Sequence, residues 1–242
     1  MAREWLQLGA LMLPALTRAR NQAVNRVPAA LTSDRRLAAV LVSIFADAYL
    51  DGTNVAVVTH GARLGLTSEV VFGETTRGLI DRSLVSIASA RDRALATFTQ
   101  DATVAELTNY FAQAATNMVW QGQDDEAEVL ATLATVEWKT WVRSFARDEH
   151  RDHHDDLNGV TIPVDDDFIL PGGPNAGARC YGPRDWDSIG DPSEWMNCGH
   201  ALEYKREATT EDIEITSRSL ETVFAPARTT RTDREIRASL GL

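Results

Sequence analysis

The hydrophobic pattern of this chain changes near Thr135, and this change limits the possible folds more than any other feature. Before it, apolar residues recur at intervals of three and four, the period of a helix that buries one face. After it, β-branched and aromatic residues form short runs separated by glycine and proline. The sequence therefore predicts an α+β chain: a mainly helical region at 1–134, a small β-rich, loop-rich C-terminal domain at 135–206, and a polar tail at 207–242 that orders on a partner.

Four segments of the first region carry the helical pattern. One is expected to run over 33–52 and to end at an Asp-Gly pair, and a second covers 80–95. A third begins at Thr103, where Thr103 and Glu106 are spaced as a capping box. A fourth, over 124–134, opens with acidic residues that suit the positive end of the helix dipole.

The second region is predicted to contain three short strands, at 136–142, 159–162 and 201–204. Before the last of them, the stretch 171–192 is rich in glycine and proline. We expect this stretch to hold no regular structure and to be organised by side-chain contacts.

Charge and cysteine usage exclude several classes of protein. The formal net charge of -11 argues against nucleic acid as the main partner, and no sequence-specific nucleic acid is expected. Two cysteines are too few for a disulfide scaffold, which fits a reducing cytoplasm. The apolar stretch at 8–16 is interrupted by Pro14 and is not expected to be a signal peptide. Because no apolar run reaches about 18 to 20 residues, no membrane span is expected.

His154, Cys198 and His200 form the most informative constellation. The alternation of a strand places Cys198 and His200 on one face, where they are expected to face His154. Thiolate and imidazole both suit tetrahedral zinc, so these three residues are candidate zinc ligands. Downstream of His154, residues 158–159 suit a tight turn, and Leu157 is expected to fill the core beneath it.

A fourth ligand has three candidates, His150, His153 and Cys180, none with the paired spacing of a zinc ribbon or finger. Two interpretations of the constellation stay open. Either these side chains hold a metal ion, or they hydrogen-bond to one another and to the backbone and so clasp the long loop, with Cys198 as a small buried apolar residue.

The order of these residues resembles the C-terminal domain of the Mu F-like phage head morphogenesis family, over residues 136–204. A tryptophan-containing strand is followed by R-x-x-H-x-x-L-x-G, and the loop after it is closed by N-C-x-H and a short strand. The residues that carry this pattern are Trp138, Trp141, Arg151, His154, Leu157, Gly159, Phe168, Asn197, Cys198 and His200.

This chain also departs from the family pattern. In that family the first pair is often Cys-x-x-Cys and the closing pair Cys-x-Cys; here Arg151 with His154 and Cys198 with His200 stand at the corresponding places. Arg151 cannot ligate a metal, because a guanidinium has no lone pair to offer. The R-T-E helix motif frequent in relatives is not visible before Trp138.

The resemblance implies a minor capsid protein of a tailed bacteriophage, made in the host cytoplasm and packaged into the head of the virion. It implies association with the portal protein and the major capsid protein during procapsid assembly, and a structural role without catalysis. The helical pattern of residues 33–134 agrees with the variable helical region that precedes this domain in the family.

Two enzyme classes remain as alternatives. His153 or His154 with Asn197 and His200 would suit an HNH-like nuclease, but the last two residues stand too close together for its ββα module. The tripeptide Asp-His-His at 152–154 occurs in a phosphoesterase family, which requires further carboxylates on parallel strands. We expect no enzyme, with a metal-dependent nuclease or phosphoesterase as the competing hypothesis.

Overall fold

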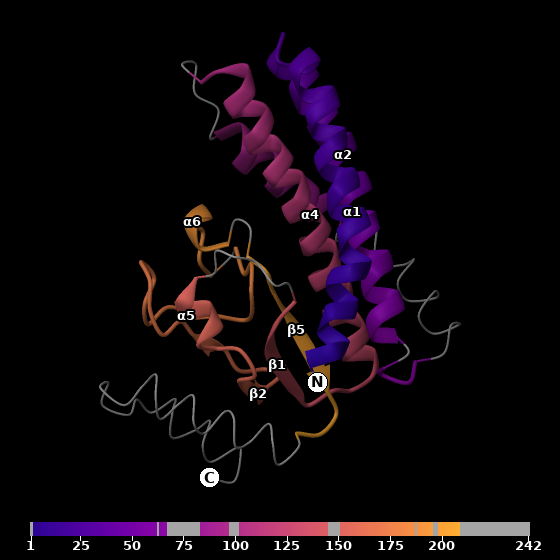
Figure 1. The fold of residues 1–242 in the computed structure, drawn as a ribbon, viewed down its shortest axis with the longest axis vertical. Coiled ribbons are helices and arrows are strands. Elements are labelled where there is room, and N and C mark those ends of the chain that lie inside the picture. The colour runs from indigo at the N-terminus through magenta and orange to yellow at the C-terminus, as the bar shows by residue number, and fades with distance from the viewer. Residues whose placement is uncertain are drawn as a thin grey trace. The chain divides into compact units, whose positions relative to one another are not determined.

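The computed structural model of this 242-residue chain describes residues 2–61, 63–66, 83–96, 102–144, 151–186, 188–195 and 198–208. The chain divides into two compact units, a helical unit within residues 7–130 and a mixed unit that contains residues 131–208 (Figure 1). Long helices make up the first, and short strands with loops make up the second. The predicted α+β class is therefore confirmed.

The helical unit is built from three long helices and a shorter helical segment. Ser33 caps the second helix, because its side chain accepts a hydrogen bond from the backbone N–H of Arg36 at 3.3 Å. Residues 83–96 are also helical, whereas the start of the predicted 80–95 helix lies outside the described residues. The long helices are α1 (Ala2–Ala30), α2 (Asp34–Ala56), which continues into the π-helix η1 (Val57–Gly61), and α4 (Val104–Leu133).

The predicted capping box at the start of α4 is confirmed. The Thr103 backbone N–H donates to Glu106 Oε2 at 2.8 Å, and the Glu106 N–H donates to Thr103 Oγ1 at 3.2 Å. Each side chain thus satisfies a backbone N–H of the other residue near the first turn. The Thr103 hydroxyl, which donates to the Glu106 carboxylate at 2.7 Å, and the Thr103 backbone N–H hold the pKa of Glu106 below its usual range.

Two predicted helix boundaries are wrong, and two glycines explain both. The helix expected to end at Gly52 continues through it, and the helix expected over 124–134 is the last part of α4. A Cβ at Gly52 would lie 1.9 Å from the carbonyl oxygen of Val119, and one at Gly122 would lie 2.1 Å from that of Tyr49. Both glycines therefore permit a close backbone contact between α2 and α4 instead of ending a helix.

The stretch Asp34–Gly61 corrects a further expectation. It is 28 residues long, with a mean hydropathy of 1.3 over its most apolar window, so by length and composition it is able to cross a membrane. The continuous-run criterion missed it because small and polar residues separate its large apolar ones. A buried core helix has the same composition, and 44% of that window is buried in the helical unit, so this finding by itself is weak evidence for a membrane.

Three antiparallel strands form the centre of the mixed unit. The central strand β1 (Trp138–Arg143) pairs with β2 (Thr161–Pro163) on one side and with β5 (His200–Lys205) on the other. The register places Trp141 opposite Leu202 and Thr140 opposite Thr161. All three predicted strands are present, with ends shifted by one or two residues.

The turn-rich stretch and the residues that flank it contain regular structure that was not predicted. β3 (Phe168–Ile169), just before the stretch, pairs with β4 (Arg179–Cys180) inside it, and the single turn α6 (Pro192–Trp195) begins at its last residue. Each piece has only two to four residues, too short for a periodic signal in the sequence. Most of the polar tail, residues 209–242, lies outside the described residues.

The close backbone contacts at Gly52 and Gly122 yield a first prediction. Gly52→Ala and Gly122→Ala should each lower the free energy of unfolding by about 1 to 3 kcal/mol, because the added methyl group meets a backbone carbonyl that has no room to move. Elsewhere in a helix, glycine to alanine stabilises by about 1 kcal/mol. Asn54→Ala, at an exposed position of α2, is the control. Urea denaturation followed by circular dichroism measures the change, and a gain in stability for the glycine variants would contradict the close contact.

His60 yields a second prediction. It is 3% exposed, and Gln123 Nε2 lies 3.2 Å from its Nε2, a distance that suits a neutral imidazole acceptor. Burial, assisted by Arg63, lowers the pKa of His60 to about 4. The unfolded chain therefore takes up a proton here near pH 6.5 and the folded chain only near pH 4, so acidification through this window favours unfolding.

Between pH 7 and pH 5 this difference should cost about 2 kcal/mol of stability. Glutamine cannot take up this proton. On going from pH 7 to pH 5, His60→Gln should therefore lose about 2 kcal/mol less stability than the natural chain. Urea denaturation at the two pH values measures it. Equal losses in both proteins would show that His60 is not the group responsible.

Candidate functional site

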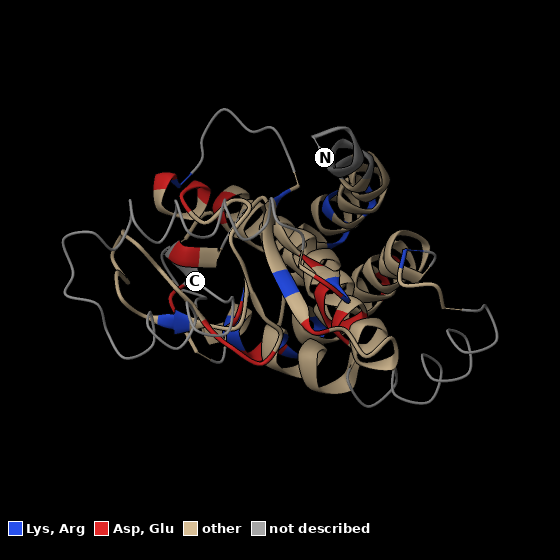
Figure 2. Cartoon of the chain, turned by 90° about the horizontal axis from the view of Figure 1, so that it is seen from below, with Lys and Arg blue, Asp and Glu red and all other residues tan. Residues whose placement is uncertain are grey.

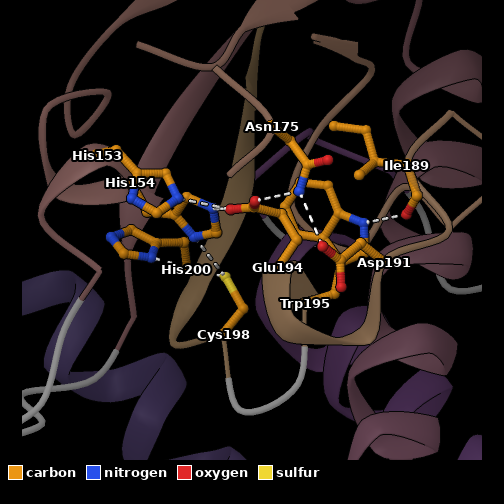
Figure 3. Close-up of polar contacts among 9 residues, drawn as sticks. All are labelled: His153, His154, Asn175, Ile189, Asp191, Glu194, Trp195, Cys198 and His200. Carbon is orange, nitrogen blue, oxygen red and sulfur yellow. Dashed lines mark hydrogen bonds and ion pairs between the residues drawn. The ribbon is translucent and has the colours of Figure 1, made fainter. Parts of the chain in front are cut away.

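The three predicted ligand residues, His154, Cys198 and His200, lie together in the mixed unit (Figure 3). Nδ1 of His154 lies 3.4 Å from the Cys198 sulfur, and Nδ1 of His200 lies 3.7 Å from the same sulfur. The exposed fractions of these residues are 1%, 2% and 2%, in the same order. The thiol therefore stands between two imidazole nitrogens in the interior.

Three short elements bring these side chains together. His153 and His154 lie on α5 (Asp152–Asp155), Cys198 lies just before β5, and His200 is the first residue of β5. The alternation that placed Cys198 and His200 on one face therefore agrees with the structure. The close approach also depends on β1, because β5 pairs with it along its whole length.

The turn after α5 directs His154 inward. Gly159 has φ +87°, a conformation that glycine adopts without strain, and its N–H donates to the Trp141 carbonyl at 2.8 Å. Asn158 Oδ1 accepts the Arg143 N–H at 2.8 Å, and Leu157 is buried, as predicted. This turn joins α5 to β2 and fixes the direction of the helix that carries the histidines.

The opposite ring nitrogens of both histidines meet carboxylates. Nε2 of His154 lies 2.6 Å from Oε1 of Glu194, and Nε2 of His200 lies 3.0 Å from Oδ1 of Asp155. A carboxylate only accepts hydrogen bonds, so each Nε2 carries the proton. The Nδ1 atoms that face Cys198 then hold the ring lone pairs.

Glu194 is the residue of this site that the sequence analysis missed. It lies on α6, is fully buried, and accepts hydrogen bonds from Nε2 of His153 and His154, both at 2.6 Å to Oε1. Asn175 Nδ2 donates to its other oxygen at 2.7 Å and also contacts Asp191 at 3.3 Å. No spacing rule identifies Glu194, because it follows the turn-rich stretch directly and nothing in the sequence separates it from the acids nearby.

The environment sets the charges of this cluster. Burial alone would raise the pKa of Glu194, but hydrogen bonds from Asn175, His153 and His154 outweigh it and leave that pKa below its usual range. Burial, together with the neighbouring His153 and His200, lowers the pKa of His154 to about 3, against the attraction of Glu194. The site therefore holds an ionised carboxylate and a neutral His154 imidazole at neutral pH.

Two tryptophans enclose His154. The Trp195 ring stacks on it, with centroids 5.4 Å apart and planes at 29°, and the Trp141 ring meets it edge-on at 5.6 Å. Both tryptophans are fully buried, and Trp195 Nε1 donates to the Ile189 carbonyl at 2.7 Å. These rings keep water away from the cluster and limit the motion of the imidazole.

Two further residues hold the loops around the cluster. Gly173 has φ +76°, and a Cβ there would lie 2.6 Å from Cε1 of His153, so only glycine lets the loop pass over that ring. Arg184 is buried, with Nη1 donating to the Cys198 carbonyl at 3.0 Å. A buried arginine in a loop gives no signal in the sequence that separates it from a surface arginine.

The three candidates for a fourth ligand have different outcomes. His153 lies at the site, but its Nε2 contacts Glu194, and it groups with His154 and Glu194 instead of with Cys198. Cys180 lies on β4 and joins neither group; burial, with Asp185 and Asp167 nearby, raises the pKa of its thiol. His150 lies outside the described residues.

The structure places some of the residues named for the enzyme alternatives. His200 begins a strand paired with β1, and Asn197 lies outside the described residues. Asp152 to His154 form the single turn α5 beside an antiparallel sheet, whereas the phosphoesterase hypothesis needs parallel strands. A general base works best with a pKa near the working pH, far above the value for His154.

Comparison with known proteins gives no match: no family model, no curated protein and no solved structure is significantly similar to this chain.

The Glu194 network yields a third prediction. Glu194→Ala leaves the donors of His153, His154 and Asn175 without this acceptor. Since a hydrogen bond to a charged group contributes about 1.5 to 3 kcal/mol, the free energy of unfolding should fall by at least about 3 kcal/mol. Asp165→Ala, which removes the same charge from an exposed position of the mixed unit, should change stability by less than about 0.5 kcal/mol. Urea denaturation followed by tryptophan fluorescence compares them. Equal effects would contradict a stabilising role for Glu194.

Proposed function

We propose that this chain is a minor head morphogenesis protein of a tailed bacteriophage, which associates with the portal and major capsid proteins during procapsid assembly and stays in the virion. The proposal starts from the resemblance of residues 136–204 to the Mu F-like family. One observation carries it further: three residues of that motif, His154, Cys198 and His200, meet in one buried cluster of the mixed unit.

Several motif residues stabilise the fold of the mixed unit, each through a different contact. Trp141 is a fully buried member of the central strand and packs against Phe168 with ring centroids 5.2 Å apart. His154, Cys198 and His200 join the two ends of the long loop, and Gly159 makes the turn into β2. A motif whose members fix one small fold is what a rigid assembly module requires.

Burial of the cluster favours this role over catalysis. A substrate must reach the reacting groups, but His154, Glu194 and Cys198 are each no more than 2% exposed. The neutral His154 donates a hydrogen bond to the ionised Glu194, and this pair stabilises the fold without a bound substrate.

The helical unit offers apolar surface for protein partners. Large apolar side chains on two of its helices are between 37% and 64% exposed. Large contiguous apolar patches mark protein–protein interfaces, and we propose that an assembly partner covers these residues. These residues are Leu11, Leu13 and Val24 on α1 with Val42, Leu50 and Val58 on α2 and η1.

The charge distribution agrees with protein partners. Asp and Glu number 35 against 24 Lys and Arg. Figure 2 shows acidic and basic residues interspersed over the described ribbons. A DNA-binding surface instead needs lysine and arginine gathered into one footprint that neutralises phosphates.

Mass spectrometry of gradient-purified particles from a producing lysate tests the proposal. We expect peptides of this chain in the head fraction at a low, fixed ratio to the major capsid protein, and that ratio should not change on a second gradient. An abundant host cytoplasmic enzyme, followed in the same fractions, controls for trapped material.

Recovery of the chain only from the soluble fraction would overturn the proposal. Nuclease and phosphoesterase assays with the soluble chain would then test the competing hypothesis. A hydrolytic activity lost in the double variant Cys198→Ser, His200→Ala, yet kept in Cys180→Ser, would support it.

A further inference from the structure

We infer that the mixed unit binds one zinc ion through Nδ1 of His154, the sulfur of Cys198 and Nδ1 of His200. The inference rests on the geometry of these three side chains and is independent of the virion role proposed above. It selects one of the two interpretations that the sequence leaves open.

The spacing of the three atoms fits a tetrahedral metal. Zinc bonds of about 2.3 Å to sulfur and about 2.0 Å to nitrogen place a sulfur and a nitrogen ligand about 3.5 Å apart at the tetrahedral angle. The Cys198 sulfur lies 3.4 Å from Nδ1 of His154 and 3.7 Å from Nδ1 of His200. Both sulfur-to-nitrogen separations therefore match those around a bound ion, and the ligand atoms of the three side chains all lie within 4.8 Å of one another.

The orientation of both imidazoles fits as well. A histidine that ligates a metal usually donates its other ring N–H to a carboxylate or carbonyl, which fixes the ring and makes the ligating nitrogen more basic. His154 has this arrangement with Glu194 at 2.6 Å, and His200 has it with Asp155 at 3.0 Å. Two independent carboxylates thus aim two Nδ1 lone pairs at one sulfur.

The neighbouring group of His153, His154 and Glu194 does not fit an ion. Zinc ligands with bonds of about 2.0 Å lie about 3.3 Å apart. Both histidine nitrogens instead lie 2.6 Å from Oε1 of Glu194, which is the length of a charge-assisted hydrogen bond. A neutral imidazole has a single ring lone pair, so His154 serves only one of the two groups.

The donor types select the metal. One thiolate with two imidazoles suits zinc, whereas magnesium and calcium require oxygen ligands. Binding displaces the thiol proton of Cys198, and the ion then joins chain segments 44 residues apart. Three protein ligands leave one position of a tetrahedral ion for water.

Cobalt and zinc binding to the purified full-length chain tests the inference. After treatment with chelator and reductant, titration with Co²⁺ alone should give the visible bands of a tetrahedral ion and a thiolate-to-cobalt charge-transfer band, both saturating at one ion per chain. Added Zn²⁺ should abolish both bands. The charge-transfer band reports the sulfur ligand in the unsubstituted protein, so the result does not depend on whether a variant folds.

Variants identify the ligands. Cys198→Ser should abolish the charge-transfer band, whereas Cys180→Ser, which removes the other buried thiol, should leave the spectrum unchanged. Glu194→Gln should weaken zinc binding roughly 10- to 100-fold, as expected for a carboxylate that orients a ligating histidine. A chain that binds no cobalt or zinc, an octahedral spectrum, or a charge-transfer band that survives in Cys198→Ser would each overturn the inference.

Discussion

The buried carboxylate of Glu194 is the interaction on which the mixed unit depends. It is fully buried and joins α6 to α5 through two histidines and to the intervening loop through Asn175. An ionised group in the interior is costly unless several donors surround it. The turn-rich stretch has too little regular structure to hold a single conformation by backbone pairing alone. The network therefore stabilises the conformation in which the hydrogen bonds of Glu194 are all made.

The sheet supplies the rigid frame against which this network forms. β1 lies between β2 and β5, so the segment that carries Cys198 and His200 is placed by backbone pairing before any side chain contributes. On the face of β1 that bears Trp141, the buried Lys139 lies over the ring of Tyr181, with Nζ 3.2 Å from the ring centroid. This cation–π contact joins β1 to the loop that follows β4.

The helical unit depends on a different constraint, the close approach of two backbones. Gly52 and Gly122 each face a carbonyl oxygen of the opposite helix, so α2 and α4 meet where neither bears a side chain. Apolar residues such as Phe45 and Phe111 are buried in the same unit. Glycine at this contact sacrifices helix propensity, and the gain in packing offsets the loss.

The sequence by itself determined the features that depend on neighbours along the chain. Periodicity predicted the α+β class and the strands, spacing predicted the capping box at Thr103, and alternation placed Cys198 beside His200. Only the tertiary structure decided what depends on contacts between distant residues. Gly52 indicates a helix end locally but lies at a helix contact, and Glu194 resembles every other acid of its loop until burial beside His154 gives it three donors. Burial and hydrogen-bond partners are properties of the assembled fold, so no local pattern encodes them.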